Sequence, residues 1–410
     1  MKQLFGFLFW SQLVIGGVNS SVAQWVQTNG LGGGGVSSFA VTGTNLFAGT
    51  YSGGVFLTTD DGISWTALNS GLTDTSIYSL AALPNGVGGT YLFAGPASGD
   101  LFRSTNNGLN WSSVGSDLAG VNVHAFAFSG SNYFAGTAGI GGVFRSTDNG
   151  TSWVPAFSGL TDSFVHALAV SGTYLFAGTG LSGVFRSTNY GASWTAVNNG
   201  LTCPYAYALA VIDSSLFAGT GAGGVFCSTN NGANWIQVNN GLTASYVDAF
   251  AVSGTNLFAG LNGGGVFLST NGGTTWNRVG NLGYVYALAI SGVNLFAGDW
   301  AGRVWRRPLS EMITNVESNL EMSRQFVLEQ NSPNPFNPTT KIQFVMSGFG
   351  HATLRVYNPL GQQLATLVDE ELSPGSYIRE WNAQGMASGV YFYQLQAGGF
   401  VGTRKMLLVR

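Results

Sequence analysis

Residues 165–197 read VHALAVSGTYLFAGTGLSGVFRSTNYGASWTAV, and this stretch sets the pattern for most of the chain. It contains four short runs of β-type residues, which are Val165 to Val170, Tyr174 to Ala177, Val184 to Ser187 and Trp194 to Val197. Clusters of Gly, Asn and Ser separate the runs, as expected for strands joined by tight turns. The stretch therefore predicts a unit of four antiparallel strands.

The same unit recurs along the chain. A Leu-Phe-Ala-Gly or Tyr-Phe-Ala-Gly block occurs seven times at a spacing of roughly 41 residues. The phenylalanines of this block are Phe47, Phe93, Phe134, Phe176, Phe217, Phe258 and Phe296. Four short strands in a repeat of this length are typical of one blade of a β-propeller. The sequence therefore predicts an all-β fold with a seven-bladed β-propeller.

The last repeat lacks the tryptophan that ends the others. It stops after residues 303–307, while the other repeats close with Trp65, Trp111, Trp153, Trp194, Trp235 and Trp276. The missing strand resembles the stretch from Trp25 to Leu31, which reads like Trp194 to Leu201. We expect this N-terminal strand to close the seventh blade, which leaves no open sheet edge. The predicted propeller spans residues 24–308.

A hairpin motif, Ser/Thr-x-Asp/Asn-x-Gly-x-x-Trp, precedes each of these six tryptophans, as in residues 146–153. On this motif the chain resembles the Asp-box, or bacterial neuraminidase repeat, propellers, a group that includes sialidases. Two copies carry Asp, at Asp60 and Asp148, and four carry Asn, which favours a structural role for the turn. Sialidase activity does not carry over, because residues 24–308 contain no Glu and their arginines are spread around the repeats.

One position of the first strand varies strongly among constant neighbours: Ser37, Tyr78, His124, His166, Tyr207, Asp248 and Tyr286. Two residues earlier come Phe164, Tyr205, Tyr246 and Tyr284, and the loop after the second strand adds Tyr51, Asn262, Asp299 and Trp300. First strands line the central channel of a propeller, and aromatic rings with carboxylates suit sugars or peptides. The predicted ligand-binding residues are Tyr78, His124, His166, Tyr207, Tyr246, Asp248, Tyr284, Tyr286, Asp299 and Trp300. The alternative is that these side chains merely fill the channel mouth.

Asp248 and Asp299 are weak catalytic candidates, because paired carboxylates are what a glycosidase requires. We expect no metal and no cofactor. The formal net charge of −3 gives no general attraction to nucleic acid, and a hydrophobic content of 45% excludes a disordered chain.

The two cysteines, Cys203 and Cys227, lie in the same repeat. At the equivalent positions of the preceding repeat stand Asp162 and Arg186, an acid and a base. This correspondence suggests that the two positions are in contact, and an exported protein can form a disulfide there. Two buried free thiols are the alternative.

The two ends of the chain carry targeting signals. Residues 1–23 have the pattern of a secretory signal peptide, and no later stretch is long and apolar enough to predict a membrane-spanning helix. Residues 309–326 are predicted to form a linker, and residues 327–410 a small immunoglobulin-like β-sandwich. Four ordered motifs, at 332–338, 354–361, 387–393 and 403–409, resemble the type A sorting domain of type IX secretion. The resemblance implies that the type IX machinery handles the protein, which passes through the periplasm to the outer cell surface or the medium.

These features favour a secreted or surface-displayed binding or adhesion module whose ligand is an extracellular glycan or protein. Two alternatives stay open. The first is an extracellular glycan hydrolase or lyase. The second is a structural surface or matrix component, which 62 glycines and 8% charged residues would suit.

Overall fold

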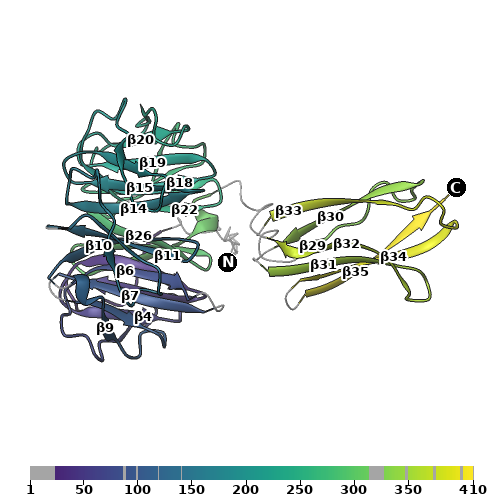
Figure 1. Ribbon diagram of the computed structural model, residues 1–410, viewed down its shortest axis with the longest axis horizontal. Coiled ribbons are helices and arrows are strands. Elements are labelled where there is room, and N and C mark those ends of the chain that lie inside the picture. The colour runs from purple at the N-terminus through teal and green to yellow at the C-terminus, as the bar shows by residue number, and fades with distance from the viewer. Residues whose placement is uncertain are drawn as a thin grey trace, which may run out of the picture. The chain divides into compact units, whose positions relative to one another are not determined.

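The computed structural model describes residues 24–85, 89–97, 100–118, 120–139, 141–313, 327–346, 350–372, 375–397 and 400–409. The predicted signal peptide and residues 314–326 of the predicted linker lie outside these residues. The chain divides into two compact units, Met1–Met312 and Ile313–Arg410 (Figure 1). Each unit has its own core and is described by itself.

The N-terminal unit is built from four-stranded antiparallel sheets whose strands follow one another in chain order. The first sheet contains β2 (Val36–Thr42), β3 (Asn45–Thr50), β4 (Gly54–Thr58) and β5 (Thr66–Ala67). The second contains β6 (Ile77–Pro84), β7 (Thr90–Pro96), β8 (Leu101–Ser104) and β9 (Ser112–Val114). The third contains β10 (Asn122–Ser129), β11 (Asn132–Ala138), β12 (Val143–Ser146) and β13 (Val154–Pro155). The fourth sheet contains β14 (Val165–Ser171), β15 (Tyr174–Thr179), β16 (Val184–Ser187) and β17 (Thr195–Ala196). The fifth contains β18 (Ala206–Ile212), β19 (Ser215–Thr220), β20 (Val225–Ser228) and β21 (Ile236–Gln237). The sixth contains β22 (Val247–Ser253), β23 (Asn256–Leu261), β24 (Gly265–Ser269) and β25 (Asn277–Gly280). Short 3-10 turns occur at Ser116–Leu118 and Leu309–Glu311. The predicted units of four antiparallel strands are therefore confirmed.

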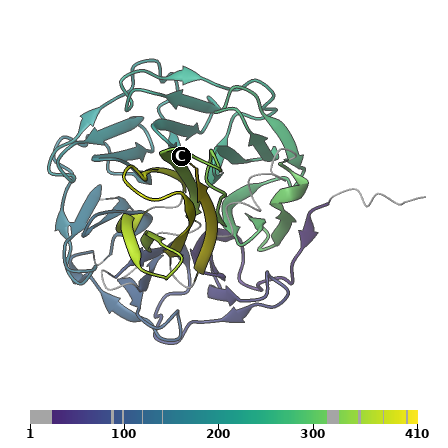
Figure 2. The same cartoon turned by 90° about the vertical axis from the view of Figure 1, so that its right-hand side faces the viewer.

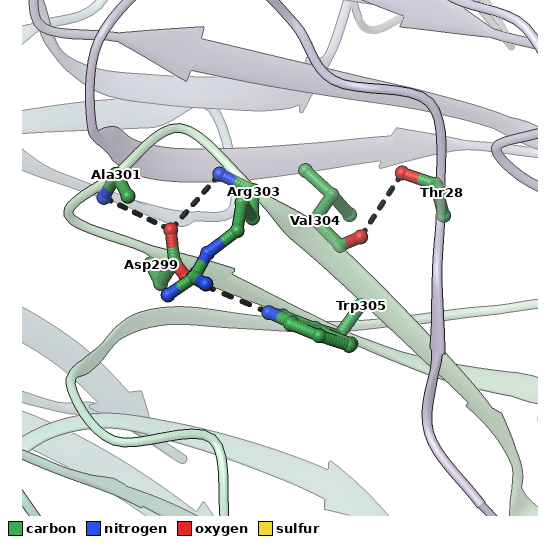
Figure 3. Close-up of polar contacts among 6 residues, drawn as sticks. All are labelled: Thr28, Asp299, Ala301, Arg303, Val304 and Trp305. Carbon is green, nitrogen blue, oxygen red and sulfur yellow. Dashed lines mark hydrogen bonds and ion pairs between the residues drawn. The ribbon is translucent and has the colours of Figure 1, made fainter.

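A further sheet joins the two ends of the N-terminal unit. It contains β26 (Val285–Ser291), β27 (Asn294–Asp299), β28 (Val304–Pro308) and β1 (Val26–Gln27), and β1 pairs antiparallel with β28. Beside the strand, Thr28 Oγ1 donates a hydrogen bond of 3.1 Å to the Val304 carbonyl (Figure 3). Trp25 Nε1 donates a bond of 2.8 Å to the Val279 carbonyl of β25. Trp25 and Thr28 thus contact two different sheets, through residues that lie more than 250 positions further along the chain.

The core of this unit lies between neighbouring sheets, which are arranged around a circle in Figure 2. The phenylalanines of the repeated block are all buried. Phe134 of β11, for example, packs in one apolar cluster with Val165 and Trp194 of the next sheet. Burying a side chain of this size contributes roughly 1.5–3 kcal/mol, so the repeated phenylalanine accounts for much of the cohesion between sheets.

The glycine of the repeated block allows the sheets to approach closely. A methyl group on Gly136 of β11 would lie 2.6 Å from Val165 Cγ1 of β14, and one on Gly298 of β27 would lie 2.5 Å from Val36 Cγ1 of β2. Carbon atoms cannot approach to such distances, so only glycine fits at these positions. The contacts bring each first strand against the next, and β26 against β2.

The hairpin motif forms the turn between the third and fourth strands. In one copy, Ser146 Oγ donates to Asp148 Oδ1 at 2.7 Å and accepts a bond from the Gly150 amide. Asp148 Oδ1 also accepts a bond of 3.0 Å from the Ser152 amide. In another copy Asn106 Oδ1 accepts the equivalent bond from the Asn110 amide at 3.0 Å. Because an amide oxygen replaces the carboxylate oxygen here, the exchange of Asp for Asn is explained by a structural role.

The C-terminal unit contains two antiparallel sheets around one core. One sheet has the order β29-β30-β33 and the other β32-β31-β34-β35. The core includes Phe344, Leu354, Tyr393 and Leu395, each of them fully buried. The strands are β29 (Val327–Leu328), β30 (Thr339–Met346), β31 (Gly350–Tyr357), β32 (Gln363–Leu372), β33 (Gly375–Asn382), β34 (Gly389–Ala397) and β35 (Phe400–Leu408).

The predicted disulfide between Cys203 and Cys227 is wrong, because both cysteines are free and buried. Cys203 packs with Trp235 in one apolar cluster, whereas Cys227 packs with Trp276 in the next cluster around the unit. Burial raises the pKa of the Cys227 thiol, which keeps it protonated and unreactive.

In the fourth sheet, the side chains at the two equivalent repeat positions bond to different partners. Asp162 accepts a hydrogen bond of 2.7 Å from the Leu181 amide within its own sheet. Arg186 instead donates a bond of 2.9 Å to the Asn231 carbonyl of the following sheet. The two positions therefore have different partners, and an acid and a base at matching positions do not imply contact.

Trp25 provides a test of how much the N-terminal strand stabilises the unit. We expect Trp25→Ala to lower the free energy of unfolding by roughly 2–4 kcal/mol, since truncation of a fully buried Trp costs about 3–5 kcal/mol and Trp25 is partly buried. Val26→Ala on the same strand is the control, because Val26 is 53% exposed and the change should stay within about 0.5 kcal/mol. Chemical denaturation of the three proteins measures the difference. Equal stability of the Trp25 and Val26 variants would contradict a stabilising role for the strand.

Candidate functional site

A β-bulge near the start of each first strand places the candidate side chains. In β2, β6, β10, β14, β18, β22 and β26, one residue is skipped in the pairing with the following strand. A bulge leaves one residue unpaired and re-aims its side chain. The skipped residues are Ser37, Tyr78, His124, His166, Tyr207, Asp248 and Tyr286. The variable position of the sequence is therefore the bulge position of the structure.

The bulge side chains and their neighbours form a nearly continuous series of ring contacts, which we call the aromatic belt. Centroids of consecutive rings lie 4.8 to 5.6 Å apart, in stacked, tilted or edge-to-face pairs, a geometry that aromatic rings favour. The belt runs in order through Tyr286, Trp300, Tyr51, Tyr78, His124, His166, Tyr207 and Tyr246. Among the described residues, no ring contact joins its two ends, Tyr246 and Tyr286.

The residue after the second strand complements the size of the bulge residue. In the repeats with Tyr78, His124, His166 and Tyr207 at the bulge, this loop position is Ala or Gly, and a methyl group on Gly221 would lie 2.6 Å from a carbon of the Tyr207 ring. The repeat with Tyr286 departs from this pattern, because Trp300 occupies its loop position and contacts Tyr286. Where the bulge residue is Ser37, the loop position is Tyr51, whose ring fills the belt between Tyr78 and Trp300.

Asp248 and Asn262 follow the same pattern, with a short residue at the bulge and a larger side chain in the loop. Tyr51 is thus part of the belt, and Asn262 donates a hydrogen bond to Asp248 where the belt is interrupted. Both loop residues are recognised from the sequence, but neither is in the predicted binding set. The sequence signal for them is a loop position that holds Gly or Ala in the four repeats with Tyr78, His124, His166 and Tyr207 at the bulge.

Asp248 lies between the two ends of the belt. Its Oδ2 atom is buried and has no hydrogen-bond partner. Burial raises the pKa of the Asp248 carboxyl to about 7, although a hydrogen bond from the Asn262 side chain opposes this shift. A buried polar atom without a partner is rare in folded proteins, which makes Asp248 a candidate functional residue.

The phenols of the belt stay protonated at neutral pH. Burial raises the pKa of Tyr51 to about 12, and nearby Tyr78, Tyr286 and Asp248 add to the shift. Burial also raises the pKa of Tyr246, which shares a hydrogen bond with Tyr207. The pKa of Tyr286 is raised by burial and by the charge of Asp248. These rings therefore present neutral hydroxyl groups and electron-rich faces.

The two histidines of the belt are neutral at pH 7. Burial, assisted by the nearby His166, lowers the pKa of His124 to about 4. Burial also lowers the pKa of His166, against the opposing effect of Asp162. The His124 ring stacks on Tyr78 at 4.9 Å and meets His166 edge-on at 5.5 Å. Neither histidine supplies a positive charge to Asp248.

The structure gives Asp299 a different role from the predicted one (Figure 3). Its side chain is 2% exposed, and Oδ1 accepts bonds of 2.9 Å from the amides of Ala301 and Arg303. Oδ2 accepts a bond of 2.6 Å from Arg303 Nε and a longer one of 3.5 Å from Trp305 Nε1. Because its lone pairs are engaged in this turn, Asp299 is not free to act on a ligand or as the partner of Asp248 in catalysis.

That turn nevertheless contributes to the site, since it contains Trp300. Trp300 is 60% exposed and contacts both Tyr51 and Tyr286. Tyr284 is also exposed, at 55%, and the remaining belt residues are partly buried. Of the predicted set, the structure therefore brings together the bulge residues, Tyr246 and Trp300, leaves Tyr284 at the exposed side and assigns Asp299 to the turn.

Comparison with known families identifies the C-terminal unit. Residues 332–409 match the family described as "Secretion system C-terminal sorting domain". This match confirms the predicted sorting domain and indicates a secreted or cell-surface protein. No curated protein matches the chain. Among the described residues, none of the helical segments has the length and apolar character needed to cross a membrane.

Several solved structures resemble the chain in fold. PorZ of Porphyromonas gingivalis, a surface component of the type-IX secretion system, is 15% identical with a TM-score of 0.54, over 92% of this chain and 60% of PorZ. YCF48 from Cyanidioschyzon merolae is 15% identical with a TM-score of 0.52, over 70% of this chain and 99% of YCF48. The GH74 xyloglucanase from Xanthomonas campestris is 16% identical with a TM-score of 0.54, over 86% of this chain and 63% of the enzyme.

This chain thus spans less than two thirds of the length of PorZ and of the xyloglucanase. At such low identity the similarity shows a shared fold alone. The neighbours are β-propeller proteins, which confirms a propeller-like fold for this chain. Another YCF48 structure is described as bound to D1 peptide.

The pKa of His124 leads to a testable acid response. Its folded value of about 4 lies below the ordinary value of 6.5, so the unfolded chain binds the proton first as pH falls. The corresponding stability is present above about pH 6.5 and is lost as the pH falls towards 4. We expect the melting temperature of His124→Gln to fall less than that of the unmodified chain when the pH is lowered from about 6.5 to about 4. His351→Gln, in the C-terminal unit, is the control, and NMR titration of the His124 ring near pH 6.5 would contradict the expectation.

Proposed function

We propose that the N-terminal unit is a seven-bladed propeller, closed by β1, that acts as a secreted or surface-displayed binding or adhesion module. Its ligand is an extracellular glycan or protein, held at the aromatic belt. Pairing of β1 with β28 and the close approach of Gly298 to Val36 support the closed arrangement. The peptide described on YCF48, a protein of the same fold, is compatible with a protein ligand.

The observation that carries the binding proposal is Asp248 within the aromatic belt. A belt that served only as packing would be expected to satisfy its buried polar atoms, because unpaired ones are costly. Oδ2 of Asp248 has no partner, and the adjoining belt contains Trp300, which is 60% exposed. Large exposed aromatic residues next to unsatisfied polar groups are typical of ligand sites.

The C-terminal unit supplies the route of export. We propose the division into a signal peptide at 1–23, the propeller at 24–308, a linker at 309–326 and an immunoglobulin-like sorting domain at 327–410. The family match over 332–409 supports the last of these. In this scheme the chain crosses the periplasm, and the type IX machinery delivers it to the outer surface or the medium.

A glycan hydrolase is the second candidate, and one observation favours it. A carboxyl group with a pKa of about 7, as Asp248 has, suits general acid catalysis at neutral pH. A glycosidase requires a second carboxylate, and Asp299 is engaged by Arg303. Binding without turnover therefore fits the described residues better.

A ligand screen tests the binding proposal. The purified chain is applied to glycan and peptide arrays, and Trp300→Ala with Tyr284→Ala should weaken binding of any ligand found by roughly tenfold or more, since exposed aromatic anchors carry much of a site's affinity. The melting temperature should hardly change, because both residues are exposed. Ile236→Ala, at an exposed position on β21, is the control. Retained binding in the double variant would contradict a belt site, and release of cleaved glycan would favour the hydrolase.

Deletion of residues 327–410 tests the export proposal. We expect the truncated protein to accumulate in the periplasm in folded form, because the N-terminal unit has its own core. Cell fractionation and surface labelling measure its location, and the full chain with Trp300→Ala is the control that should still reach the surface. Surface display of the truncated chain at the normal level would contradict the role of the sorting domain.

A further inference from the structure

Asp248 occupies the single interruption of the aromatic belt. The rings of Tyr246 and Tyr286 are the two ends of the belt, and Asp248 is the bulge residue of β22, the strand that contacts β26. The charge of Asp248 raises the pKa of the phenols of Tyr51, Tyr246 and Tyr286, so the carboxylate interacts electrostatically with all three. The carboxylate is therefore surrounded by neutral, electron-rich rings.

No described cation balances this carboxylate. Among the described residues of the N-terminal unit, the ion pairs are Arg303 with Asp299 and Arg307 with Glu311, and neither involves Asp248. Asn262 supplies a neutral hydrogen bond, and Oδ2 is left without a donor. A carboxylate in this position gains from any group that brings both a positive charge and an N–H donor.

The surroundings restrict the kind of cation. Among the described residues no group of three or more His, Cys, Asp and Glu side chains could hold a metal ion, so a lone carboxylate offers a metal too few ligands. Ring faces attract organic cations, which favours an ammonium or guanidinium group. A quaternary ammonium has no N–H for Oδ2, whereas a primary ammonium has three.

The burial of Oδ2 restricts the shape of the ligand. The oxygen is covered, so a group that reaches it must be slim and must displace the atoms that cover it. A lysine side chain meets this requirement, because its unbranched stem packs along ring faces while its ammonium group reaches the polar atom. The ammonium group of an amino sugar is attached directly to a bulky ring, and the forked guanidinium group of arginine is wider.

We propose that Asp248, between Tyr246 and Tyr286, binds the primary ammonium group of a lysine side chain in a protein ligand. Oδ2 accepts one N–H of that group, and the ring faces with exposed Trp300 contact its stem. This inference rests on the proposed function of the belt as a binding site and narrows its ligand from glycan or protein to a lysine-bearing protein surface.

Calorimetry on the full chain tests the proposal with short capped peptides. The probes are Gly-Lys-Gly, the same peptide with Nε-acetyl-lysine, the same peptide with Nε-trimethyl-lysine, and free glucosamine. We expect the lysine peptide to bind in the millimolar range, and acetylation or trimethylation to weaken binding by roughly tenfold or more. Equal binding of the acetylated or trimethylated peptide would overturn the proposal. Stronger binding of glucosamine would overturn the assignment to lysine.

Two charge variants separate a local effect from a general one. Asp248→Asn keeps the shape of the side chain and should weaken binding of the lysine peptide by about tenfold or more. Asp213→Asn removes one charge at an exposed turn and should leave binding unchanged. The melting temperature of Asp248→Asn should equal or exceed that of the unmodified chain, because an unpaired buried carboxylate is removed. Unchanged binding in Asp248→Asn, or a marked fall in its melting temperature, would overturn the assigned role.

The outcomes also distinguish this inference from the proposed function. An array ligand whose binding is lost in the Trp300 and Tyr284 double variant, but is unaffected by Asp248→Asn, would sustain the belt as a site and overturn the lysine assignment. Failure of both the array and the lysine peptide would overturn both.

Discussion

The close contact between the glycine of the Phe-Ala-Gly block and the first strand of the next sheet sets the distance between neighbouring sheets of the N-terminal unit. Gly136 faces Val165 and Gly298 faces Val36 at distances that exclude any Cβ atom. Without this approach, the buried phenylalanines could not pack against the next sheet, and the first strands could not lie side by side. Most contacts between rings in the aromatic belt follow from the same spacing, because apart from Tyr286 and Trp300 the neighbouring rings come from different sheets.

The β-bulges convert this scaffold into a surface that can vary. An ordinary strand alternates its side chains between two faces that pack against neighbouring sheets, so substitutions there disturb the core. The bulge residue is released from that alternation, which allows Ser37, His166 and Asp248 to occupy equivalent places. The loop after the second strand adjusts in size, as Tyr51 does beside Ser37. The fold thus separates residues that hold the sheets together from residues that define the belt.

The electrostatics of the belt are simple because nearly all of its groups are neutral. The two histidines lose their charge through burial, and the tyrosines retain their protons. Arg303 is committed to Asp299. Asp248 is therefore the group whose charge state a ligand can change most, and a positively charged ligand would hold it in the ionised form. A hydrolytic role is less well supported, because the carboxylate of Asp299 is engaged by Arg303 and is not free to act as a second catalytic group.

The sequence by itself determined the strands, the turns, the repeat and the sorting domain, because each depends on local signals that recur or occur in a fixed order. Alternating apolar residues, the glycines of the hairpin turns and the Phe-Ala-Gly block can be recognised in the sequence without coordinates. The variable first-strand position was also legible, since the repeats supply their own internal alignment. Only the tertiary structure decided that this position is a bulge and that the Tyr51 ring lies between Tyr78 and Trp300. It also decided that Arg303 engages Asp299, and that Cys203 and Cys227 pack in separate clusters. These properties depend on which side chains meet across different sheets and which lone pairs are already engaged, and neither is encoded in the spacing of residues along one strand.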